Sequence, residues 1–83
     1  DLVEHKIIID IEGYRERREC SLRAQAHEEA LIAVREGQEI VLEPMPACDR
    51  RIIHVCLHSD PTVETYSEGV EPERCVVIKP LVR

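Results

Sequence analysis

Two arginines and two histidines recur within the short segment from Asp49 to His58, at spacings that suit a helix. At about 100° per residue, Arg50, Arg51, His54 and His58 fall within one arc roughly 100° wide. Apolar side chains fill most of the remaining circle. Burial does not require four hydrogen-bond donors on one stripe, so the pattern favours an anionic ligand, most simply a phosphate backbone. A solvated face on an amphipathic helix is the alternative interpretation.

Four further polar or aromatic side chains are candidates for the same patch. Tyr14 offers a face on which a base can stack. Arg15 and Arg18 continue the core stripe of the long helix beyond its last apolar residue, so we expect their guanidinium groups at the mouth of the buried seam. The alternative is that the aliphatic parts of these two arginine side chains only cover the edge of the core. Ser67 could donate to phosphate or sugar, or could stabilise a turn.

Other chemistries fit the sequence less well. His54 and His58 stand at i and i+4, a workable zinc pair, but no third ligand is evident because Cys56 points to the opposite side of the helix. A nucleophilic Cys48 with His54 would need an orienting group and an oxyanion hole, and neither is recognisable. We therefore predict no metal, no cofactor and no enzymatic activity. A protein-interaction module that uses an acidic surface remains the alternative to nucleic-acid binding.

The chain's 83 residues predict one domain, spanning 1–83 with a core of about 6–80, and its first residue, Asp1, suggests a piece of a longer chain. The net charge is −6, but basic residues cluster at Arg15 to Arg18 and at Arg50 to Arg51. Binding depends on local potential, so we expect weak affinity alone, with another domain adding to it.

The four cysteines, Cys20, Cys48, Cys56 and Cys75, lack paired metal-binding spacing. We expect reduced, mostly buried thiols and a cytoplasmic location. No apolar run approaches the roughly 20 residues of a membrane span, so we expect no membrane insertion.

The elements that must position these residues follow from periodicity and turn signals. The sequence predicts an α+β fold in the order β-α-β-α-β-β, with one mixed sheet and two helices on one of its faces. The long helix should carry an apolar stripe and end at Gly37, and the second helix should start near Pro46 without a good cap, with Ile52 where it meets the sheet. The strands are expected at 5–11, 39–42, 62–68 and 75–79, and the helices at 14–36 and from Pro46 to His58.

Arg50-x-x-x-His54 resembles the signature of the R-three-H family, small domains that bind single-stranded nucleic acid. The wider pattern resembles the C-terminal domain of the bacterial Jag (SpoIIIJ-associated) RNA-binding proteins. Five blocks occur in order: Gly13-Tyr14-Arg15-Glu16-Arg17-Arg18, Leu42-Glu43-Pro44-Met45, Arg50-Arg51-Ile52-Ile53-His54, Thr65-Tyr66-Ser67-Glu68-Gly69 and Val76-Val77-Ile78-Lys79-Pro80.

The resemblance implies a single-stranded RNA or DNA ligand and an adjacent K-homology domain in the full-length protein. We expect Arg50 and His54 to be exposed, so that replacing either with alanine leaves the melting temperature nearly unchanged and weakens binding. The opposite interpretation is that both side chains are structural, locked to a neighbouring acid or carbonyl.

Overall fold

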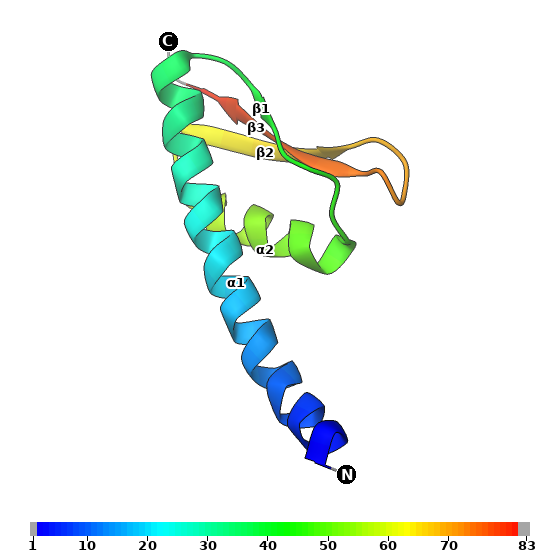
Figure 1. Ribbon diagram of the computed structural model, residues 1–83. Helices are drawn as coiled ribbons and strands as arrows, with labels where there is room; N and C mark the ends of the chain where they lie inside the picture. The colour runs from blue at the N-terminus through cyan, green and yellow to red at the C-terminus, as the bar shows by residue number, and fades with distance from the viewer. Residues whose placement is uncertain (1, 82–83) are drawn as a thin grey trace.

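A long helix, a short helix and a three-stranded sheet make up the fold of the computed structural model, which describes residues 2–81, with side chains described from Gly13 onward (Figure 1). The elements, in chain order, are α1 (Leu2–Glu36), β1 (Ile40–Val41), α2 (Ala47–Leu57), β2 (Val63–Glu68) and β3 (Cys75–Pro80).

The sheet has the strand order β1-β3-β2, and both pairings are antiparallel. Ile78 of β3 lies opposite Ile40 on one side and Thr65 on the other. Because side chains alternate along a strand, Val63, Thr65 and Ser67 of the edge strand β2 share the face that the helices cover. The residues between them face the other way.

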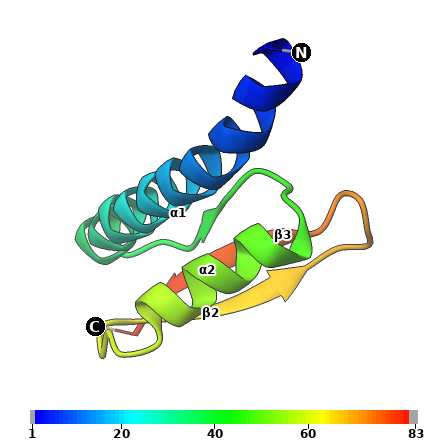
Figure 2. The ribbon, with the colours of Figure 1, turned by 90° about the horizontal axis from the view of Figure 1, so that it is seen from below.

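Both helices pack on this one face, with α2 in front of β2 and β3 in Figure 2 and α1 alongside. The apolar stripe predicted for the long helix is confirmed: Leu22, Ala26, Ala30 and Ala33 are all buried. These small alanines let α1 lie close to the sheet. The rest of the buried core comes from α2, the strands and the loop before α2: Ile53, Leu57, Leu42, Met45, Val63, Val76 and Ile78.

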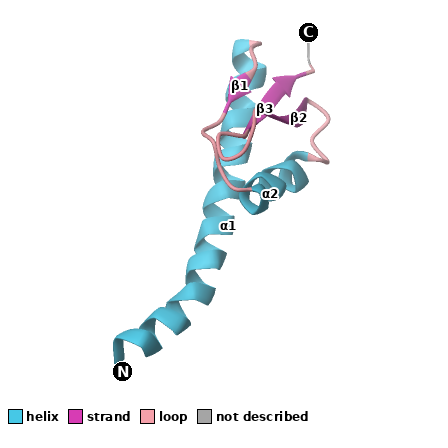
Figure 3. Ribbon diagram, turned by 90° about the vertical axis from the view of Figure 1, so that its right-hand side faces the viewer, coloured by secondary structure: helices cyan, strands magenta, loops and turns pink. Residues whose placement is uncertain are grey.

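Gly37 ends α1, as predicted, with a φ of 66° that favours glycine. Its N–H donates to the Ala33 carbonyl over 2.8 Å, which satisfies one of the helix's last acceptors. The opposite end of α1 extends past α2 (Figure 3).

The turn between β2 and β3 needs Gly69, whose φ is 101° and whose added Cβ would lie 3.3 Å from the Glu73 carbonyl oxygen. The turn is closed by a 2.8 Å hydrogen bond from the Glu73 N–H to the Val70 carbonyl. The position of this turn matters because the side chain of Glu71, which lies within it, contacts α2.

The α+β class and the placement of both helices on one face are confirmed, but the expected first strand is wrong. Residues 5–11 belong to α1, which begins at Leu2 rather than Tyr14. A strand must find a neighbour to satisfy its backbone N–H and C=O groups, whereas a helix satisfies them within itself. Without that strand the sheet is not mixed, since β3 lies between β1 and β2 and pairs antiparallel with both.

Two further expectations concern α2. Its start at Pro46 lacks a side-chain cap, as predicted. Ile53, rather than Ile52, is the fully buried isoleucine of this helix, and Ile52 is only partly buried beside α1.

The expectation of mostly buried cysteines is wrong, because Cys20 and Cys48 are exposed and the other two partly so. Alanine and isoleucine fill the core positions instead. No helix in the described residues is long and apolar enough to cross a membrane.

Candidate functional site

Arg50 is the most constrained of the predicted site residues. Its exposed fraction is 6%, and its Nη1 donates to the Met45 carbonyl oxygen over 2.6 Å. The guanidinium also faces the Glu71 carboxylate, with Nη2 2.5 Å from Oε2 and Nη1 3.4 Å from Oε1. The expectation that Arg50 is exposed is therefore wrong: a carboxylate and a backbone carbonyl hold it in place.

Glu71 is the exposed partner of this ion pair, with 58% of its side chain accessible against 8% for Arg50. The hydrogen bond from Arg50 lowers the pKa of the Glu71 carboxyl below its ordinary value, and the charges of Arg50 and Arg74 lower it further. Glu71 is thus ionised at neutral pH and provides the counter-charge that a buried guanidinium requires.

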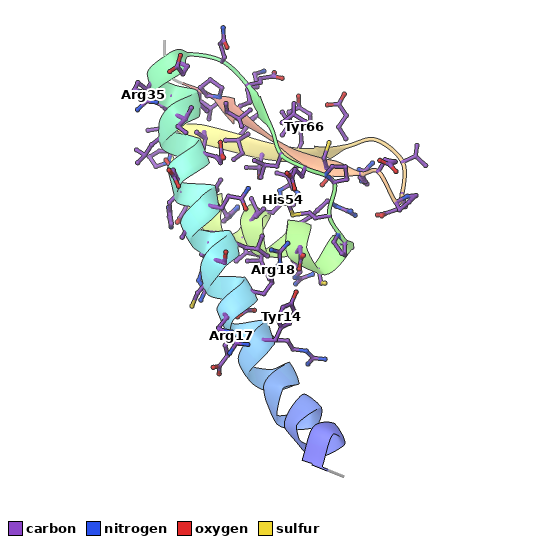
Figure 4. All side chains as sticks on the ribbon, viewed as in Figure 1. Tyr14, Arg17, Arg18, Arg35, His54 and Tyr66 are labelled. Atoms are coloured by element: carbon purple, nitrogen blue, oxygen red, sulfur yellow. The ribbon has the colours of Figure 1, made fainter. Side chains whose placement is uncertain are left out.

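His54 lies one turn after Arg50, between α2 and β2 (Figure 4). Its Nδ1 is 2.7 Å from the Thr65 hydroxyl and its Nε2 is 2.9 Å from the Ser67 hydroxyl. Partial burial, and then the charge of Arg50, lower the pKa of the imidazole below its ordinary value. His54 is therefore a neutral, hydrogen-bonded link to β2 at pH 7 rather than a cation.

A cavity of about 520 Å³ lies between the middle of α1 and the start of α2, and Tyr14, Arg15 and Arg18 line it together with Glu19, Cys48, Asp49 and Ile52. Figure 4 shows Tyr14 and Arg18 on the side of α1 that faces α2, with Arg17 on the other side. Both predicted arginines of α1 therefore lie at the opening between the two helices.

Arg18 bridges the two helices at this cavity. Its Nη2 lies 3.2 Å from the Asp49 carboxylate, and its side chain remains 41% exposed. The Asp49 side chain is only 15% exposed, so the pair is partly buried and its separation leaves a largely buried carboxylate without its arginine. The guanidinium can turn to a phosphate only by giving up this ion pair, whereas Tyr14, 60% exposed, needs no rearrangement to accept a base.

The arginine–histidine stripe of α2 divides between two environments. Arg50 and His54 turn toward the sheet and the β2–β3 turn, while Arg51 and His58 are exposed on the outer side of the helix. Neither Arg15 nor Arg51 forms an ion pair with any side chain of residues 13–81. These two arginines are consequently the most accessible cations of the predicted set.

The outer face of the sheet has the opposite character. Glu64, Tyr66 and Glu68 alternate with the helix-facing residues of β2, so they point away from both helices, as Figure 4 shows for Tyr66. Tyr66 donates a hydrogen bond to the Glu39 carboxylate over 3.4 Å. This acidic face is where an acidic interaction surface would lie.

Three functional partners were not found from the sequence. Glu71 lies 21 residues from Arg50, in the loop between the expected strands 62–68 and 75–79. Arg74, whose guanidinium donates to the Gly69 and Ser67 carbonyls, was not singled out either. Alternation within the expected strand 62–68 places Thr65 and Ser67 on one face, but it does not predict that both hydroxyls bond to His54.

The zinc and catalytic alternatives gain no support from the geometry. Among the described residues, no group of three or more His, Cys, Asp or Glu side chains is placed to hold a metal ion. Cys56 faces α1, with its Sγ 3.3 Å from Nε2 of His27. His54 is occupied by two hydroxyls rather than by Cys48.

Comparison with known proteins gives a consistent family match. The family model of the R-three-H domain matches residues 21–80. The chain is 42% identical over 73 residues to a protein named RNA-binding protein KhpB from Clostridium symbiosum, and 38% identical over 72 residues to that from Lactiplantibacillus plantarum. The KhpB protein of Bacillus subtilis is 35% identical over 74 residues.

These matches cover 87–88% of this chain but only part of each relative. The aligned region is 22% of the Lactiplantibacillus protein, 33% of the Clostridium protein and 36% of the Bacillus protein. The chain therefore spans about a fifth to a third of the length of these relatives.

Replacing Arg50 with alanine should destabilise the domain. The buried Met45 carbonyl would lose its donor, which costs about 1–3 kcal/mol. Arg51→Ala, which removes an exposed arginine from the same helix, should change the free energy of unfolding by less than about 0.5 kcal/mol. Urea unfolding of both variants measures this. Equal midpoints for Arg50→Ala and the unchanged protein would show that the guanidinium is not part of the fold.

His54 should make stability depend on pH. Its lowered pKa means that the unfolded chain binds more protons than the folded one between the folded pKa and the unfolded value of about 6.5. The free energy of unfolding should therefore fall as the pH drops through about 6.5, until the folded pKa is reached.

Urea unfolding at a series of pH values measures this slope, and His54→Gln should flatten it. The control is His58→Gln, which removes the exposed histidine of the same helix and should leave the contribution of His54 intact. An unchanged slope in His54→Gln would contradict the assignment.

Proposed function

Because the chain belongs to the R-three-H domain family, we propose that it binds single-stranded nucleic acid, RNA in the first instance, through the side formed by its two helices. The observation that carries this proposal is the placement of Tyr14 and three arginines on the helical side. Arg15 and Arg18 line the cavity between the helices, beside Glu19 and Asp49, and Arg51 is exposed on the outer side of α2. The outer face of the sheet instead carries Glu64 and Glu68 beside Lys79, and it offers a polyanion no comparable group of arginines.

The proposed contacts divide by accessibility. Arg15 and Arg51 bind phosphates directly, and Arg18 joins them by releasing Asp49. Tyr14 stacks on a base at the cavity between the helices, whose volume of about 520 Å³ is within the range of ligand pockets, about 300–1,000 Å³. His58 extends the surface toward the end of α2.

Arg50, His54 and Ser67 form the other edge of this surface. They hold the β2 edge and the β2–β3 turn against α2, through the Arg50–Glu71 pair and the His54–Ser67 hydrogen bond. Their hydroxyl and guanidinium donors lie beside the exposed part of α2. In this proposal they shape the surface and supply donors to its rim.

The domain is proposed to act as a binding module, without catalysis, within a larger cytoplasmic protein. The relatives are about three to five times longer than the aligned region, and the resemblance to Jag proteins suggests a K-homology domain beside this one. A second nucleic-acid-binding domain raises affinity through effective concentration, so one domain need not bind tightly alone.

A second candidate function is binding of a cationic protein partner to the outer face of the sheet. Val41, 62% exposed, and Tyr66, 38% exposed, flank Val77 on that face, beside Glu64 and Glu68. This arrangement of apolar and acidic groups suits a basic segment and excludes a phosphate backbone. Substitutions on the helical side and on the outer face of the sheet distinguish the two candidate functions.

Affinity for a labelled single-stranded oligouridine should fall with salt. If about four phosphates are neutralised, the slope of log K against log salt should be near −3, at about −0.7 per phosphate. Fluorescence anisotropy at several salt concentrations measures the slope. A salt-independent affinity would contradict phosphate binding by this surface.

The same titration compares matched variants. Arg51→Ala and Tyr14→Ala should weaken binding several-fold. Arg35→Ala, at the far end of α1, and Tyr66→Ala, on the outer face of the sheet, are the controls and should change it little (Figure 4). Loss of binding in Tyr66→Ala with none in Tyr14→Ala would place the ligand on the sheet and overturn the proposed surface.

A further inference from the structure

An exposed carboxylate covers the buried guanidinium of Arg50 at the rim of the proposed surface. Glu71 faces Arg50 through both of its oxygens, over 2.5 Å and 3.4 Å. The charge of Arg74 contributes to the lowered pKa of the Glu71 carboxyl, but its guanidinium donates to backbone carbonyls rather than to Glu71. Arg50 is therefore the cation that Glu71 contacts.

The two sides of this ion pair are not equally fixed. Arg50 is held by the buried Met45 carbonyl and has almost no exposed surface. Arg74 is held by the Gly69 and Ser67 carbonyls. Glu71, by contrast, is 58% exposed and makes its side-chain hydrogen bonds only to Arg50 among the described residues. The cations stay in place, and the carboxylate is the part that can leave.

A buried guanidinium needs an anion, but any anion with two suitably placed oxygens can satisfy its fork. A nucleic-acid phosphate carries one negative charge, like the carboxylate, and presents two such oxygens. The site that Glu71 occupies therefore has the chemistry of a phosphate site.

We propose that the Glu71 carboxylate occupies a phosphate subsite formed by Arg50, and that a nucleic-acid phosphate binds there by displacing it. This inference rests on the proposed function and adds an intramolecular competitor to it. Glu71 lowers the affinity of the free domain for nucleic acid while it keeps the buried guanidinium neutralised. A purely structural Glu71 predicts the opposite, since its removal would loosen the turn and weaken binding.

The test is fluorescence anisotropy with a labelled single-stranded oligouridine and three variants. Glu71→Gln removes the competing charge. Glu73→Gln is the matched control, because it makes the same charge change in the same turn, and the Glu73 side chain forms no hydrogen bond or ion pair with any described residue. Glu71→Asp keeps the net charge but shortens the reach to Arg50.

The expected result is a several-fold gain in affinity for Glu71→Gln beyond that of Glu73→Gln, and a gain for Glu71→Asp at unchanged net charge. In an Arg50→Lys background, checked for folding by circular dichroism, the excess should disappear because an ammonium does not form the fork. Binding by Glu71→Gln where the unchanged domain binds undetectably would support the proposal in its strongest form.

Equal affinities for Glu71→Gln and Glu73→Gln, with measurable binding by the unchanged domain, would overturn the inference and leave the proposed function standing. Weaker binding by a folded Glu71→Gln would also overturn it, in favour of a structural role. Absence of binding by every variant would overturn both the inference and the proposed function.

Discussion

The buried guanidinium of Arg50 is the interaction on which the candidate site depends. A charge with 6% exposure must be neutralised and hydrogen-bonded, and the two groups that do so come from different parts of the chain. The Met45 carbonyl belongs to the loop before α2, and Glu71 to the turn after β2. The Met45 N–H in turn donates to the Arg74 carbonyl over 3.2 Å, so the loop and the turn are also joined directly. Arg50 thus fixes both segments beside the same end of α2.

His54 extends this arrangement along the helix. One turn after Arg50, it joins α2 to the hydroxyls of Thr65 and Ser67 on β2. With two polar links on the sheet side of α2 and Ile52 packed toward α1, the helix presents a defined outer side to solvent. The exposure of Arg51 depends on this placement. Because Arg50 turns toward the sheet and Ile52 toward α1, the side chain between them points to solvent.

The proposed binding of a polyanion by a domain with a net charge of −6 depends on where its charges lie. The carboxylates of Glu64 and Glu68 lie across the sheet and the helical layer from the arginines of α1 and α2. At physiological ionic strength the Debye length is about 8 Å, so charges on the far side of two layers are largely screened. Local potential, rather than the sum of charges, governs the encounter with nucleic acid.

Short-range sequence patterns predicted which side of α1 is buried and where this helix ends. The spacing of Leu22, Ala26, Ala30 and Ala33 fixes which side of α1 is buried, and Gly37 fixes where the helix ends. Features that depend on distant partners were not predictable in this way. Whether residues 5–11 form a strand depends on a neighbouring strand to pair with, and the burial of Arg50 depends on a carboxylate 21 residues away.

The predicted stripe on α2 shows the same limit within one element. The arc of roughly 100° that contains Arg50, Arg51, His54 and His58 is wide enough to include both a sheet-facing and a solvent-facing edge, so its members do not share one environment. Periodicity gives the angle between side chains, whereas the position of the β2 edge decides which of them are buried.

Nucleic-acid binding on the helical side is the central claim, and chemical-shift mapping of the backbone amides with single-stranded oligouridine tests it most directly. We expect the largest changes around Tyr14 and Arg18 in α1, around Arg51 in α2 and at the β2–β3 turn. The amides of β1 and those around Lys79 in β3 should change little. Changes centred on the outer face of the sheet, with α1 and α2 unaffected, would contradict the claim.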